Sequence, residues 1–190
     1  FCANWRVMGR NTRDRTPENV IEELKEIKYK FGINSVVFLD DTFTLSPKWV
    51  REYCEDLKRR KLNIKWGCQS RVDQTDMSLM KLMKESGLVQ LDFGVESGSE
   101  KILKVLGKGG AGDRTSQIKQ SFKMCKELDI RTLATFIIGN PEETREDIEQ
   151  SFQVAKEIAA DYTAFYFLTP YPGTDIYNMA IENKWLFCHN

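Results

Sequence analysis

The residues of this chain that could do chemistry lie in short polar or glycine-containing stretches. A cysteine stands at the start, in Phe1-Cys2-Ala3-Asn4. Five further stretches each follow closely on a short apolar run of strand length: Asp40-Asp41, Ser70-Arg71, Glu96-Ser97-Gly98, Gly139-Asn140-Pro141-Glu142 and Tyr171-Pro172-Gly173-Thr174. In parallel β/α folds, ligands bind where the strands end. A thiol ahead of such a series therefore indicates a metal cluster at the rim of a parallel β/α barrel.

The charged residues of these stretches suit different parts of a ligand. Asp40 and Asp41 would accept hydrogen bonds from a ligand ammonium, although an ordinary loop pair is the alternative. Arg71 would clamp a carboxylate, and its alternative is a surface ion pair with Asp73. Glu96 ends an apolar strand, where burial without partners is costly. We therefore expect a ribose hydroxyl or an ammonium beside Glu96.

The other candidates are glycine, proline and hydroxyl residues. Gly139 would let a flat ligand approach the backbone, yet Gly139 and Pro141 are also explained as turn residues. The segment 167–174 predicts either a pocket wall that offers backbone groups to a base or a rigid loop that enters the last helix. Ser97 or Ser99 is expected to be a helix N-cap.

Composition sets limits on the class of protein. A length of 190 residues predicts one domain over residues 1–190. Of these residues, 41% are hydrophobic and 29% are charged. The net charge is zero, which gives no signal of binding to nucleic acid or to a membrane. No apolar run approaches the roughly 20 residues that span a bilayer. Cys54, Cys68 and Cys125 are expected to be buried. The five cysteines are widely spaced and form neither a disulfide framework nor a CxxC zinc site, so a reducing, cytoplasmic compartment fits best. His189 is the one histidine, which argues against histidine-based catalysis.

Helix signals alternate with strand signals along the whole chain. N-caps predict helices that begin after Thr16, Ser46 and Thr144, where Asp147 completes a capping box. Further helices are expected to begin near residues 76, 99, 115 and 174. Apolar runs between them predict parallel strands over residues 35–39, 64–70, 89–95, 131–138 and 163–169. The runs are continuous rather than alternating, which predicts strands covered on both faces. A glycine-rich loop over 107–112 falls in the longest interval.

Taken together, these stretches resemble the radical S-adenosylmethionine (radical SAM) superfamily, most nearly its branch of cobalamin-dependent and methylthiotransferase-like members. The resemblance covers essentially the whole chain. In that family a CxxxCxxC loop holds a 4Fe-4S cluster, and Phe1-Cys2 resembles the last position of the loop. The resemblance implies a fragment that begins inside this loop. It implies a partial (β/α)6 TIM-like barrel with about five parallel strands, helices outside and the first strand missing.

Residue roles follow from the same resemblance. Residues 39–44 look like the motif that contacts the methionine amino group, and Arg71 lies in a segment that approaches the methionine carboxylate. Residues 93–99 are the strongest match, and relatives contact methionine or ribose there. Residues 136–142 and 169–174 resemble segments beside adenine. The implied metal ligand is Cys2, no catalytic residue is assigned, and the implied cofactor-binding residues are Asp40, Asp41, Ser70, Arg71, Glu96, Ser97, Gly139, Pro141, Thr169 and Tyr171.

The function that the resemblance implies is reductive cleavage of S-adenosylmethionine to a 5′-deoxyadenosyl radical, which abstracts hydrogen from a substrate. The substrate could be a small molecule or a macromolecule, and an external electron donor is implied. Cobalamin would come from a domain outside the fragment. Either an oxidoreductase or a transferase fits, and the fragment alone is expected to be inactive.

Two other interpretations stay open on the sequence. A non-radical barrel lyase or aldolase would need a Schiff-base lysine or a phosphate-binding loop on the last strands, and neither is evident. A scaffold could bind S-adenosylmethionine without redox chemistry. Cysteines three and seven residues before Cys2 would favour the radical enzyme.

Overall fold

The computed structural model describes residues 2–9, 11–108 and 113–186. Residues 109–112 of the expected glycine-rich loop, and His189, lie outside these ranges. The described helices are α1 Asn4–Met8, α2 Pro17–Phe31, α3 Pro47–Arg59, α4 Met77–Glu85, α5 Glu100–Val105, α6 Arg114–Glu127, α7 Arg145–Ile158 and α8 Asp175–Glu182. The strands are β1 Ser35–Val37, β2 Lys65–Ser70, β3 Leu88–Glu96, β4 Arg131–Ile138 and β5 Tyr162–Phe167.

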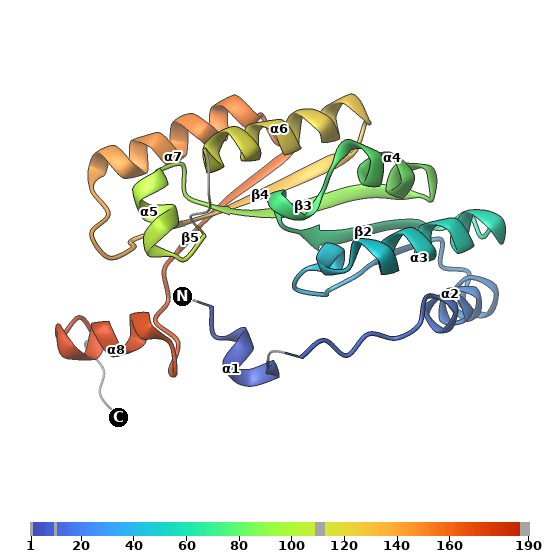
Figure 1. The fold of residues 1–190 in the computed structure, drawn as a ribbon, viewed down its shortest axis with the longest axis horizontal. Helices are drawn as coiled ribbons and strands as arrows, with labels where there is room; N and C mark the ends of the chain where they lie inside the picture. Colours follow the sequence, from blue (N-terminus) through green and yellow to red (C-terminus); the bar gives the residue numbers. More distant parts are fainter. Residues whose placement is uncertain (1, 10, 109–112, 187–190) are drawn as a thin grey trace.

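The five strands form one sheet in the order β1-β2-β3-β4-β5, and every neighbouring pair is parallel. Because sequence order equals spatial order, each crossover advances in the same direction and the sheet curls into part of a barrel. Figure 1 shows α4, α6 and α7 above the sheet, α3 beside β2, and α1 and α8 below the sheet. The expected partial barrel with five parallel strands and outer helices is confirmed.

Local caps explain where the helices begin. The Thr16 hydroxyl accepts a bond from the Asn19 amide, and Gly32 ends α2 with a left-handed φ of 69°. Ser46 caps α3, and Thr144 with Asp147 forms the expected capping box of α7. Helix α6 begins one residue before Thr115, because Asp113 is its N-cap. The sequence did not predict α1 or the short 3-10 helices Phe43–Leu45 and Val72–Gln74.

The hydrophobic core lies between the outer face of the sheet and the helices. Leu91, Phe93 and Val95 of β3 point into it, and the Phe93 ring lies 5.2 Å from that of Phe122 on α6. At the β1 and β2 end, five aromatic rings pack together: Phe38, Phe43, Trp49, Tyr53 and Trp66.

The opposite face of the sheet, here called the inner face, corrects one expectation. Along β4, buried Thr132, Ala134 and Phe136 alternate with more exposed residues, and β5 is nowhere fully buried. The prediction of strands covered on both faces is therefore wrong. A partial barrel encloses its interior only partly, so the apolar inner residues stay accessible although the sequence runs look continuous.

No helix in the described part of the chain is both long and apolar enough to cross a membrane.

Replacement of Phe93 by alanine tests the core. Phe93 is 0% exposed, so Phe93→Ala should lower the free energy of unfolding by about 3–5 kcal/mol through lost burial and a cavity. Urea unfolding followed by circular dichroism measures it. Tyr29, which is 75% exposed, is the control, and Tyr29→Ala should stay within about 0.5 kcal/mol. Equal unfolding midpoints for the two variants would contradict this packing.

Candidate functional site

The expected site residues gather at one edge of the sheet, here called the mouth. Parallel strands all end at the same edge, so the segments after β1, β2, β3, β4 and β5 meet there. The N-terminal segment reaches this edge as well. Asn4 donates through Nδ2 to Oδ2 of Asp41, which follows β1. A methyl group placed on Gly173, which follows β5, would lie 3.9 Å from Cγ of Arg6. Cys2, two residues before Asn4, is exposed.

Glu96, at the end of β3, combines a left-handed backbone with a buried ion pair. Its φ of 69° is left-handed, which is uncommon for a residue other than glycine, and the β3–β4 register shifts there. Oε1 of Glu96 lies 2.6 Å from Nζ of Lys108, and the two side chains are only 10% and 16% exposed. Such backbone strain persists only when surrounding structure enforces it, and it often marks a functional site.

Gly94 provides the room that the Glu96 carboxylate occupies. A Cβ at Gly94 would lie 2.5 Å from Oε1 of Glu96 and 3.2 Å from Nζ of Lys108. The carboxylate therefore lies over the Gly94 backbone, on the inner face of the sheet. Among the described residues, Lys108 alone forms a hydrogen bond with the Glu96 side chain, and it contacts Oε1. Oε2 is left to accept hydrogen bonds from a ligand.

The residues after Glu96 attach the strand end to α7. Gly98 donates to Oγ of Ser151 at 2.9 Å, and Oγ of Ser97 lies 3.1 Å from the same hydroxyl. A Cβ at Gly98 would lie 2.7 Å from Cα of Ser151 and would clash with the Gln150 carbonyl. Ser97 is fully buried, so its hydroxyl serves this joint. Ser99 caps α5 as the sequence predicted.

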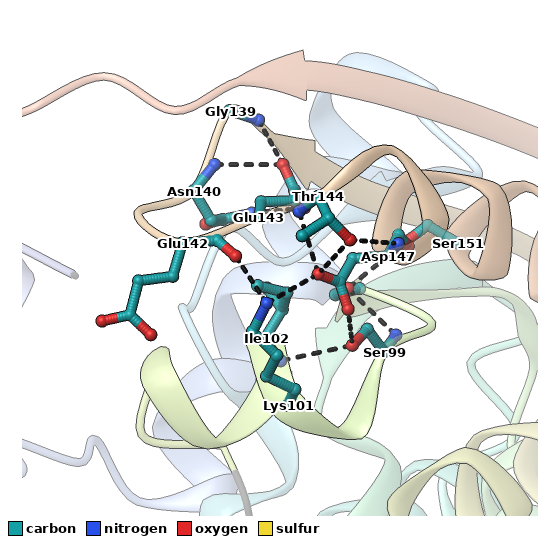
Figure 2. Close-up of polar contacts among 11 residues, drawn as sticks. Ser99, Lys101, Ile102, Gly139, Asn140, Glu142, Glu143, Thr144, Asp147 and Ser151 are labelled. Atoms are coloured by element: carbon teal, nitrogen blue, oxygen red, sulfur yellow. Dashed lines mark hydrogen bonds and ion pairs between the residues drawn. The ribbon is translucent and has the colours of Figure 1, made fainter.

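Asp147 on α7 is the centre of the same joint (Figure 2). Its Oδ1 accepts from the Ser99 hydroxyl at 2.6 Å, and its Oδ2 accepts from Lys101 at 2.9 Å and from the amide and hydroxyl of Thr144, each at 2.9 Å. The Ser99 hydroxyl, the Thr144 amide and Lys101 hold the pKa of the Asp147 carboxyl well below its usual range. One carboxylate therefore connects α5 with α7.

The loop after β4 is held by a second carboxylate. Oε2 of Glu143 accepts from the amides of Gly139 at 2.5 Å and Asn140 at 3.1 Å, as Figure 2 shows. Gly139 has a φ of 83°, and apart from its two chain neighbours no atom of the described residues lies within 4 Å of a Cβ placed on it. Pro141 is buried. The turn is rigid, and open space beside the Gly139 backbone would allow a flat ligand to approach.

Two expected ligand contacts are occupied by protein partners. Arg71 forms a two-bond pair with Asp73, at 2.9 and 2.7 Å, and Asp73 also meets buried Arg114 at 3.1 Å. The two arginines, Arg71 foremost, hold the pKa of Asp73 well below its usual range. Ser70 is buried with its hydroxyl 2.5 Å from that of Thr44. The surface-pair alternative for Arg71 is the arrangement that the structure has.

The remaining candidates are accessible. Asp40, Thr169 and Tyr171 are exposed, and the Tyr171 carbonyl accepts from the Thr174 hydroxyl at 2.7 Å. Asn4 and Lys108, which contact Asp41 and Glu96, were not predicted from the sequence. Their polar side chains stand close to candidate stretches, but no spacing rule predicts such pairs.

The cluster implied by the resemblance does not fit on this chain alone. In the described part of the chain, no group of three cysteine, histidine or acidic residues could hold a metal. Cys54, Cys68 and Cys125 are buried, and burial raises the pKa of Cys54 to about 11 and of Cys125 to about 12. Such thiols resist the deprotonation that metal binding needs. The exposed Cys2 could contribute one thiolate. The residues present fit an adenosyl ligand better, because Oε2 of Glu96 and the Gly139 backbone could each contact it.

Asp147→Asn tests the joint. The lowered pKa means that the carboxylate stabilises the fold above its unfolded pKa of about 4, and that this contribution is lost as the pH falls. We expect Asp147→Asn to lower the free energy of unfolding at pH 7 by about 2 kcal/mol. The difference from the unmodified protein should shrink below about pH 4. Urea unfolding across pH measures it, and a difference independent of pH would contradict the role of the charge.

Lys108→Met tests the ion pair. It would leave Glu96 buried without a cation and should cost about 3 kcal/mol of unfolding free energy. Lys108→Met combined with Glu96→Gln removes both charges and should restore much of that loss. A double-mutant cycle by urea unfolding gives the coupling free energy. Strictly additive effects of the two substitutions would show that the pair does not stabilise the strand end.

Comparisons with known proteins agree with this geometry. The model of the Radical SAM superfamily matches residues 1–155. The uncharacterized methyltransferase PH0819 of Pyrococcus horikoshii is 39% identical over all 190 residues, which cover 41% of that protein. The anaerobic magnesium-protoporphyrin IX monomethyl ester cyclase of Cereibacter sphaeroides is 29% identical over 93% of this chain and 29% of its own. The chain thus spans less than half the length of these relatives.

A solved structure shares the fold. The radical S-adenosylmethionine methyltransferase TsrM of Kitasatospora setae, with cobalamin and a 4Fe-4S cluster bound, has a TM-score of 0.74 at 21% identity, over 83% of this chain and 32% of its own. The coproporphyrinogen III oxidase HemN of Escherichia coli has a TM-score of 0.65 at 15% identity, over 85% of this chain and 39% of its own. With a family model that matches most of its length, and with the expected strand ends gathered at one mouth, the chain belongs to the radical SAM superfamily.

Proposed function

We propose that the protein of which this chain forms the core cleaves S-adenosylmethionine reductively and uses the product to remove hydrogen from a substrate. When bound, the 4Fe-4S cluster and S-adenosylmethionine supply the electron transfer and the radical chemistry. The observation that carries the proposal is the strained Glu96, buried with Lys108 at the mouth of a radical SAM fold. A backbone strained at a ligand-facing carboxylate is typical of a preorganised site.

Each residue of the mouth has a positioning task in this proposal. Lys108 fixes Oε1 of Glu96 and leaves Oε2 for a ribose hydroxyl or the methionine ammonium. Asp41 ties the segment that carries Cys2 to the end of β1 through Asn4. Open space beside Gly139 allows adenine to lie against the backbone. Ser70, Ser97 and Arg71 would hold these elements in place rather than contact the ligand.

The reaction after hydrogen removal depends on parts of the protein outside this chain. PH0819 is described as a methyltransferase, and TsrM is a methyltransferase with cobalamin bound. These similarities favour methyl transfer with cobalamin held by another domain, as a transferase. The likeness to a cyclase supports ring formation, an oxidoreductase reaction, as the second candidate.

The proposed setting is the reducing cytoplasm, with an external electron donor and a small or macromolecular substrate. The four cysteines that the structure describes are all free thiols, and three of them are buried. Cysteines that stay free rather than form disulfides are typical of a reducing compartment.

Reductive cleavage tests the proposal on the longer protein that carries this chain with its preceding segment. After anaerobic reconstitution with iron and sulfide and reduction with dithionite, we expect 5′-deoxyadenosine by liquid chromatography. Cys2→Ala should lose the cluster, measured as iron per chain, because one of its thiolates is gone. Cys54→Ala removes a buried thiol and should keep the cluster. A cluster-loaded, reduced sample that forms no 5′-deoxyadenosine would contradict the proposed activity.

The affinity of the protein for S-adenosylmethionine gives a second test of the proposal. Glu96→Gln should weaken S-adenosylmethionine binding about tenfold, which is about 1.4 kcal/mol, because the neutral amide accepts hydrogen bonds less strongly than the carboxylate. Isothermal titration calorimetry measures it. Glu146→Gln on the exposed first turn of α7 is the matched control. Equal affinities for the two variants would place the ligand away from Glu96.

A further inference from the structure

Asp92 is an acidic residue on the inner face that the proposed function does not use. It lies in the middle of β3, where Leu91 and Phe93 on either side point into the core. The Gln90 side chain, on the same face, donates through Nε2 to Oδ1 of Asp92 at 2.9 Å. Asp92 is partly buried. Its carboxylate therefore points into the open interior of the partial barrel.

Asp92 lacks the ion pair that the other buried acids form. Asp56, Asp147 and Glu96 each form an ion pair, whereas none of the ion pairs within the described ranges involves Asp92. Burial raises the pKa of Asp92, while ion pairs and hydrogen bonds lower those of Asp56 and Asp147. A carboxylate that is partly desolvated and lacks a cation is costly to the fold, and such groups are frequent in binding sites.

The neighbours of Asp92 form a row of side chains across the inner face. By strand register, Gln69 of β2 and Leu133 of β4 flank Asp92, and Tyr162 of β5 flanks Leu133. Tyr162 is 56% exposed although it is aromatic. This row thus places the amide of Gln69 and the carboxylate of Asp92 beside the side chains of Leu133 and Tyr162.

Toward the mouth, the inner face of β3, β4 and β5 carries small side chains. The next row of the inner face holds Gly94, Thr135 and Ala164, which are all small. Beyond Gly94 the strand reaches Glu96, whose carboxylate lies over Gly94 beside Lys108. A molecule on Asp92 would thus have its far end next to the group that we assign to the adenosyl ligand.

We propose that Asp92 is a substrate-recognition residue of the barrel interior. Its carboxylate binds a cationic or N–H donor group of the substrate, while an apolar or aromatic body lies against Leu133 and Tyr162. The atom that reacts then lies near Gly94, toward the mouth. This proposal rests on the proposed function, because that function places the radical chemistry at the mouth. Charge complementarity selects the substrate class: a carboxylate partner would be repelled, and an amine or amidine would be held.

Three small molecules of similar flat shape but different charge show whether charge or shape determines binding at Asp92. Benzamidine is flat and cationic, benzamide is flat and neutral, and benzoate is flat and anionic. Each is titrated into the 15N-labelled protein, and amide shifts are followed by nuclear magnetic resonance. We expect benzamidine to shift the signals of Gln69, Asp92, Gly94 and Leu133, benzamide to bind at least fivefold more weakly, and benzoate to leave these signals unchanged. No benzamidine shifts on the inner face would overturn the proposal.

Asp92→Asn keeps the shape of the side chain and removes its charge. It should weaken benzamidine binding at least tenfold and leave benzamide binding within twofold. Asp175→Asn, at an exposed position of α8, should leave both unchanged. A purely structural Asp92 would lower the urea midpoint when replaced, whereas a carboxylate without a partner cation predicts an equal or higher midpoint for Asp92→Asn. Equal benzamidine affinity in Asp92→Asn and the unmodified protein would refute the assignment.

S-adenosylhomocysteine, titrated in parallel, distinguishes this proposal from the proposed function. Its affinity should be the same in Asp92→Asn and the unmodified protein, because Asp92 lies below the mouth. A loss of S-adenosylhomocysteine binding in Asp92→Asn would overturn the proposal by assigning Asp92 to the cofactor. Failure of S-adenosylhomocysteine to bind the unmodified protein would contradict the proposed function, whereas the response of benzamidine to Asp92→Asn decides the role of Asp92.

Discussion

The candidate site depends on how the end of β3 is held. Glu96 adopts a left-handed backbone conformation that few side chains accept, and the chain beyond it has to return to the outer helices within three residues. Asp147 makes this possible, because it binds Ser99 and Lys101 on one side and Thr144 on the other. The contact of Gly98 with α7 completes the joint. Buried polar groups that are fully paired fix one arrangement, so the Glu96 carboxylate stays over Gly94 rather than turning away.

Much of the fold could be predicted from sequence because its signals are local. Thr16, Ser46 and Thr144 cap helices through atoms three residues away, and such contacts do not depend on the rest of the chain. The burial of the strands was mispredicted for the opposite reason. Whether Tyr162 or Val37 is covered depends on how far the sheet closes, which no local pattern encodes. The five-residue helix α1 carries no cap signal, and it lies beyond the inner side of the sheet, where Asn4 contacts Asp41.

The site residues, too, could be predicted from sequence only where the signal was local. The sequence identified Glu96 because a carboxylate at the end of an apolar run is unusual anywhere. The sequence could not show that the hydroxyls of Ser70 and Ser97 form hydrogen bonds with Thr44 and Ser151, because those partners are 26 and 54 residues away along the chain. Lys108 falls within the glycine-rich loop expected over 107–112 but was not a candidate site residue. Its pairing with Glu96 depends on the path of the chain after α5, and the physical argument for it comes from Gly94, which leaves the space that both groups fill.

The two faces of the sheet have different physical tasks, and this explains how one fold can serve relatives described as methyltransferase and cyclase. Outer residues such as Phe93 and Phe136 are fully buried, so changes there cost stability directly. The polar joint at the mouth is equally restricted, because each member satisfies another. Inner residues such as Gln69 and Asp92 add little to the core, so their chemistry can change without loss of the fold. Substrate choice can therefore vary on the inner face while the mouth keeps one geometry, since the energetic cost of variation is lowest there.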